Sequence, residues 1–75
     1  MERYRDIDGD SGVHSYEIGD GSIVIRFGKG GVYKYTDSRP GTQHVHEMQR
    51  LARSGNGLNA YVNKHVRGNY EEKLE

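Results

Sequence analysis

The chain has 75 residues, of which 32% are hydrophobic and 29% are charged, and its 11 basic residues balance its 11 acidic ones. This length allows one domain with a modest core and excludes two. The absence of cysteine excludes disulfides and thiolate metal sites. Because the formal charge is zero, no field of the whole molecule steers it to nucleic acid, and any such contact depends on local patches.

The two ends of the chain are predicted to lie outside the domain. Residues 1–11 are expected to form an acidic, flexible N-terminal tail, residues 12–70 the domain, and residues 71–75 a C-terminal tail. The final Leu74-Glu75 matches a dipeptide typical of an expression-vector scar. No stretch has the apolar length of a membrane span, and the N-terminus lacks the apolar centre of a signal peptide. We therefore expect a cytoplasmic protein without membrane contact.

Three stretches alternate apolar or aromatic residues with other residues. These residues are Tyr16, Ile18, Ile23, Ile25, Phe27, Tyr33 and Tyr35. A period of two is typical of strands with one buried face, so we predict strands near 13–18, 22–27 and 31–36. Short glycine-containing loops join them and make neighbouring strands antiparallel. The alternating residues form the predicted core face. The opposite face carries Ser15, Glu17, Val24, Arg26, Val32, Lys34 and Thr36.

After residue 41 the apolar residues follow helical spacing. Val45, Met48, Leu51 and Ala52 mark one side of a first helix, which the segment 54–57 ends. A second helix is predicted to extend to about Arg67, with Asn59, Asn63 and Arg67 on one polar side. Two short helices need an apolar surface to pack on. The predicted fold is therefore α+β, a three-stranded antiparallel β-meander followed by two short helices packed on one sheet face (β-β-β-α-α).

Between residues 13 and 70 the chain carries an ordered series of motifs. They are the strand Ile23-Val24-Ile25-Arg26-Phe27, the Gly30-Gly31 turn, the central Tyr33-Lys34-Tyr35, and then Leu51-Ala52, Ser54-Gly55-Asn56-Gly57, Tyr61-Val62-Asn63 and Val66-Arg67. Together these motifs resemble the KTSC domain. The family is named for its occurrence at the C-terminus of some lysyl-tRNA synthetases, and its hallmark is a central Tyr-x-Tyr. Many relatives continue from this strand into Val-Pro, whereas here Asp37-Ser38-Arg39-Pro40 intervenes. The resemblance implies a small, free-standing bacterial protein of unassigned function, with RNA binding suggested by the synthetase association.

The residues themselves offer the components of an RNA-contacting surface. Single-stranded nucleic acid is bound by aromatic side chains that stack on bases and by basic side chains that contact phosphates. Basic residues outnumber acidic ones between residues 26 and 67. The candidate nucleic-acid contacts are Arg26, Tyr33, Lys34, Tyr35, Arg50, Arg53, Lys64 and Arg67. We therefore expect a small, non-enzymatic binding module that contacts RNA.

Two alternative functions stay open at this point. The uncovered sheet face, with Val24 and Val32, is a candidate surface for another protein or for homodimerisation. More remotely, Asp6, Asp8, Asp10 and Glu17 reproduce the acidic spacing of an EF-hand calcium loop. Ser11 stands where such a loop needs glycine, and no entering helix precedes Asp6. The histidines show no ligand spacing, and no nucleophile and base are recognisably paired, so we assign no catalytic, cofactor or metal residues.

Overall fold

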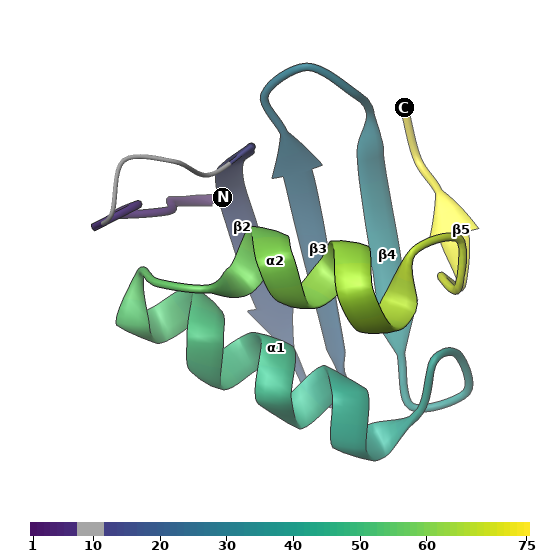
Figure 1. Cartoon of the computed structure of the whole chain (residues 1–75). Helices are drawn as coiled ribbons and strands as arrows, with labels where there is room; N and C mark the ends of the chain where they lie inside the picture. Colours follow the sequence, from purple (N-terminus) through teal and green to yellow (C-terminus); the bar gives the residue numbers. More distant parts are fainter. Residues whose placement is uncertain (8–11) are drawn as a thin grey trace.

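The protein is a two-layer α+β domain. The computed structural model describes residues 1–7 and 12–75. In chain order the elements are β1 (Glu2–Arg3), β2 (Val13–Gly19), β3 (Ser22–Phe27), β4 (Val32–Thr36), α1 (Thr42–Ser54), α2 (Leu58–Tyr61), the π-helical turn η1 (Val62–Val66) and β5 (Glu72–Lys73). Within these residues the strands form one antiparallel sheet in the order β1-β2-β3-β4-β5. Both helices cover the same face of this sheet (Figure 1).

The predicted α+β class, with an antiparallel sheet and two helices, is confirmed, but the sheet has five strands rather than three. The central pairs place Ile18 opposite Ile23 and Ile25 opposite Tyr33. A register shift between Val13 and Ser15 adds one residue to β2. Such a bulge turns the following residues to the other face, and here it places both Val13 and Tyr16 in the core.

The core lies between the sheet and the helices. Its buried members are Tyr4, Val13, Tyr16, Ile23, Ile25, Tyr35, Val45, Met48, Ala52, Leu58, Val62 and Val66. Gly55 ends α1 in the left-handed region at φ 76°, which glycine adopts without steric cost, and its N–H bonds to carbonyls of the last turn. The predicted stop at this glycine is confirmed.

Both terminal segments extend the sheet at its edges. β1 pairs with β2, and β5 pairs with β4, over two residues each. Near the N-terminus, Tyr4 is 3% exposed and its hydroxyl accepts a hydrogen bond of 3.2 Å from the Leu58 N–H, at the start of α2. At the other end, the Glu71 N–H donates to the Lys34 carbonyl at 2.8 Å. Both segments therefore take part in the fold.

No helix in the described part of the chain combines the length and the apolar character that crossing a bilayer requires.

Candidate functional site

The predicted RNA-contacting residues do not share one surface. Tyr33 and Tyr35 lie on the helix-covered face of β4, where Tyr35 is buried and Tyr33 is half-buried. Lys34 lies between them in sequence and therefore on the opposite face. Tyr33 and Tyr35 therefore do not share a face of the sheet with Lys34, because alternate residues of a strand point to opposite sides.

Arg26 and Lys34 lie on the uncovered sheet face, and in the described part of the chain neither contacts an aromatic ring. The Arg26 guanidinium donates a hydrogen bond of 3.3 Å to the carboxylate of Glu75. Lys34 stands opposite Val24 on β3 and opposite Glu72 on β5. Acidic residues of the C-terminal segment therefore offset the positive charge of this face.

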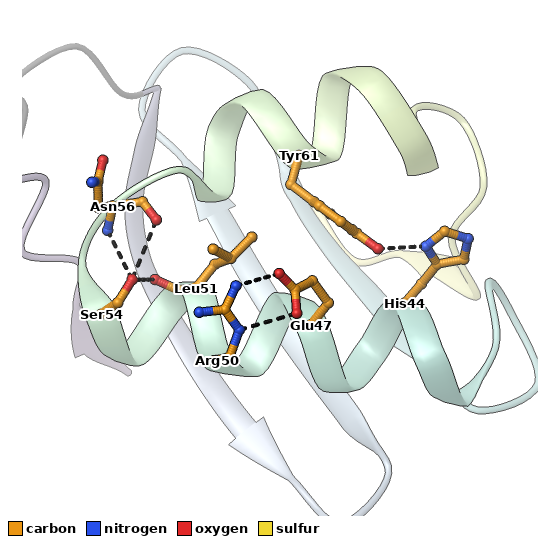
Figure 2. Close-up of polar contacts among 7 residues, drawn as sticks. All are labelled: His44, Glu47, Arg50, Leu51, Ser54, Asn56 and Tyr61. Carbon is orange, nitrogen blue, oxygen red and sulfur yellow. Dashed lines mark hydrogen bonds and ion pairs between the residues drawn. The ribbon is translucent and has the colours of Figure 1, made fainter.

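The candidate contacts on α1, Arg50 and Arg53, also lie near acidic residues. Figure 2 shows the Arg50 guanidinium against the Glu47 carboxylate, with the Nε to Oε1 distance at 3.1 Å. This hydrogen bond lowers the pKa of the Glu47 carboxyl below its ordinary value. Arg53 borders a shallow hollow together with Glu2 and Glu17. Both arginines therefore have acidic neighbours.

A cleft opens between the helix-covered face of β3 and β4 and the second helical segment. It has a volume of about 400 Å³. Its lining residues are Phe27, Gly30, Tyr33, Tyr35, Asn59, Val62, Asn63, Arg67, Gly68 and Tyr70. The cleft therefore brings together Tyr33, Tyr35 and Arg67 of the predicted contacts, whereas Arg26, Lys34, Arg50, Arg53 and Lys64 do not line it.

One wall of the cleft is aromatic. Tyr33 makes edge-to-face contacts with Phe27, at 5.8 Å between ring centroids, and with Tyr70, at 4.8 Å. Tyr70 also packs on Tyr35 at 6.5 Å. Burial of Tyr35 raises its pKa to about 12, with Tyr33 and Tyr70 adding to the shift. Each ring is positioned by another ring, a geometry that aromatic pairs prefer, so the wall is organised before a ligand enters.

The other wall is polar. Asn59, Asn63 and Arg67 recur every four residues along α2 and η1 and line the cleft together. The four-residue spacing also applies to Leu58, Val62 and Val66, which are buried in the core. A π-helical turn has more residues per turn than an α-helix, so residues four apart stay close to one face. The turn thereby keeps the apolar residues on the sheet and the polar ones along the cleft.

Two glycines leave the mouth of the cleft open. A Cβ placed on Gly30 or on Gly68 would meet no atom within 4 Å. Gly68 has φ 76°, which disfavours any side chain there, whereas Gly30 does not have positive φ. A side chain at Gly30, which borders the cleft, would therefore meet no steric obstacle and would not strain the backbone.

Sequence reasoning missed Phe27 and Tyr70 as members of the site. Phe27 was assigned to the core face, and Tyr70 follows the glycine that ends the second helical segment. The polar side formed by Asn59, Asn63 and Arg67 was the usable signal, since a polar row on a helix packed against a sheet marks its border with solvent. Which aromatic residues face that row depends on the tertiary structure.

Histidines gather elsewhere, where α1 meets the second helical segment. The Tyr61 hydroxyl and His44 Nδ1 are 2.7 Å apart (Figure 2), and the His65 ring lies 4.6 Å from the Tyr61 ring between centroids. Burial raises the pKa of the Tyr61 hydroxyl. Within residues 1–7 and 12–75, no three histidine, aspartate or glutamate side chains converge as metal ligands. Of the suggested calcium ligands, Asp8 and Asp10 lie outside the described residues.

Compared with family models, with curated proteins and with solved structures, the chain matches none of them. The resemblance to KTSC domains therefore stays a prediction from the motifs.

Proposed function

We propose that this chain is a small binding module for single-stranded RNA and that its cleft holds an unpaired base. The observation that carries the proposal is the meeting of Tyr33, Tyr70 and Arg67 at one cleft. An unpaired base exposes a flat face that stacks on aromatic side chains, at roughly 1 to 3 kcal/mol per base, while a cation binds the phosphate. The RNA contact suggested by the KTSC resemblance agrees with this proposal.

The composition of the cleft favours binding over catalysis. Among the described residues, its lining includes phenyl, phenol, amide and guanidinium groups but no histidine, serine, lysine or carboxylate. General acid–base and nucleophilic catalysis depend on such groups held close to the substrate. The cleft can therefore stack, hydrogen-bond and attract an anion, which are the requirements for holding a nucleotide.

Protein contact through the uncovered sheet face receives less support. Val32 on that face is only 3% exposed, and Arg26 and Glu75 form an ion pair. A docking face needs a contiguous exposed apolar patch. Val24, the other apolar candidate on this face, is half-buried and stands opposite the charged Lys34.

An amide NMR titration with short mixed-sequence single-stranded RNA tests the proposal. We expect shifts at Tyr33, Asn63, Arg67 and Tyr70. Binding to one phosphate should give a slope of about −0.7 in log affinity against log salt, and Arg67→Gln should remove most of that slope. No shifts at the cleft, or shifts confined to Arg26 and Lys34, would contradict the proposal.

Gly30→Leu supplies a steric test of the same cleft. The leucine side chain should fill the mouth and abolish RNA binding while the remaining amide spectrum stays that of the folded protein. Arg50→Gln is the matched control, because it removes an arginine that lies outside the cleft. Equal loss of binding in both variants would contradict the assignment of RNA binding to the cleft.

A further inference from the structure

We infer that the cleft selects an adenine nucleotide, with the Asn63 amide bonding to the base edge and Arg67 bonding to the phosphate. The inference rests on the proposed function and adds the identity of the base. It is carried by the arrangement of an exposed amide, a cation and an aromatic wall around a single cleft.

Asn63 is placed to contact a ligand rather than the protein. It is exposed, lines the cleft, and among the described residues its side chain has no hydrogen-bond partner. The carboxamide carries a donor and an acceptor side by side. Adenine presents the complementary pair, its N6 amino group beside the N7 acceptor, and asparagine is a common bidentate partner for it. Asn63 is therefore the residue we assign to base recognition.

The neighbouring Asn59 is less suited to that role. Its amide oxygen lies 3.2 Å from the point where a Cβ on Gly12 would stand. The Asn59 side chain thus packs against the start of the β2 segment. Asn59 is half-buried, which leaves Asn63 as the exposed amide among the described lining residues.

Arg67 supplies the only charge among the described residues that line the cleft. It follows η1 directly, four residues after Asn63, so the two side chains start roughly 5 to 6 Å apart on adjacent turns. Within residues 1–7 and 12–75, no carboxylate lines the cleft to offset the guanidinium. A ligand that pairs an aromatic base with an anionic phosphate matches this distribution of groups.

The size of the cleft agrees with a whole nucleotide. Pockets for small ligands usually measure about 300 to 1,000 Å³, and this one measures about 400 Å³. The ligand we assign to the cleft consists of an adenine base, a ribose and a phosphate. A free mononucleotide and a residue within an RNA strand both supply it.

The experiment compares AMP, GMP, CMP and UMP by NMR titration, with adenosine and ribose 5-phosphate as partial ligands. We expect AMP to bind at least about fivefold more tightly than the other three nucleotides, as one good bidentate contact provides. Titrations with oligoadenylate and oligouridylate distinguish a free nucleotide from a nucleotide within an RNA strand. Equal affinity per site for AMP and oligoadenylate indicates a free nucleotide, and binding of oligoadenylate alone indicates a strand.

Two variants separate the assigned roles. Asn63→Ala should remove the preference for adenine while Arg67→Gln should weaken AMP binding but not adenosine binding. Asn56→Ala is the matched control, because Asn56 is also exposed but lies in the turn before α2, outside the cleft. An unchanged preference in Asn63→Ala would overturn the assignment.

The outcomes also distinguish the inference from the proposed function. RNA binding at the cleft without discrimination among bases, or with preference for another base, would overturn the inference and leave the proposed function standing. If neither RNA nor any nucleotide shifts the cleft residues, the proposed function fails as well.

Discussion

The ring of Tyr70 packs on the ring of Tyr33 at 4.8 Å between centroids, with the two planes at 63°. Tyr33 belongs to β4, whereas Tyr70 follows the helical segment and precedes β5. This contact joins the C-terminal segment to the central sheet. It also completes the aromatic wall of the cleft.

Replacing Tyr70 with alanine should destabilise the domain and open the cleft. The change removes edge-to-face contacts with Tyr33 and Tyr35, and we expect a loss of about 1 to 3 kcal/mol. Urea unfolding followed by circular dichroism measures the loss. Tyr70→Phe keeps the ring and should unfold at nearly the wild-type urea concentration. A similar loss in both variants would show that the hydroxyl, rather than ring packing, stabilises this wall.

The Tyr4 hydroxyl should contribute to stability although it lies in the predicted tail. It accepts a hydrogen bond from the Leu58 N–H, and the preceding Gly57 offers α2 no side-chain cap. Tyr4→Phe should cost about 1 to 3 kcal/mol, because a buried N–H loses its partner. Amide hydrogen exchange at Leu58 should accelerate in the variant. Unchanged exchange at Leu58 would mean that this hydrogen bond does not protect the start of α2.

The ion pair between Glu47 and Arg50 should affect a pKa more than stability. The hydrogen bond from Arg50 lowers the pKa of Glu47, so Arg50→Gln should raise it toward the ordinary value. An NMR titration of the Glu47 carboxyl carbon measures this change. Because both groups are solvated, we expect no measurable change in urea unfolding at neutral pH. A substantial loss of stability would indicate a further role for Arg50 in the fold.

Alkaline pH should unfold the domain partly through Tyr35. Its pKa is raised from 10.0 to about 12, so the folded state favours the neutral phenol. The stabilising contribution is complete below about pH 10 and is lost as the pH rises through about 12. Tyr35→Phe cannot ionise at this position and should lose less stability over this range. Thermal unfolding at several pH values measures the difference, and parallel curves for both proteins would contradict the assignment.

Much of the fold follows from local patterns in the sequence. The alternation at Ile23 and Ile25, and at Tyr33 and Tyr35, predicts the central strands and the face that the helices cover. The spacing of Val45 and Met48 predicts α1. These predictions succeed because burial on one side of a strand or helix imposes a regular spacing of apolar residues. This spacing is visible in a short segment without reference to the rest of the chain.

The terminal strands could not be predicted in the same way. β1 and β5 contain two exposed residues each, too few to show a period. They form because the backbone groups of β2 and β4 at the sheet edges accept another strand. The stability of such short strands depends on nearby anchors, namely Tyr4 in the core and Tyr70 against Tyr33.

The sequence by itself determined the class of fold, the central strands, the helices and the glycine stop between them, since each depends on residues close together in the chain. Only the tertiary structure decided which of the candidate residues meet. Tyr33 and Arg67 are far apart in sequence and line one cleft, whereas Lys34, adjacent to Tyr33, lies on the other side of the sheet. The physical reason is that alternation separates neighbours in a strand, while packing of a helix on the sheet brings distant residues together.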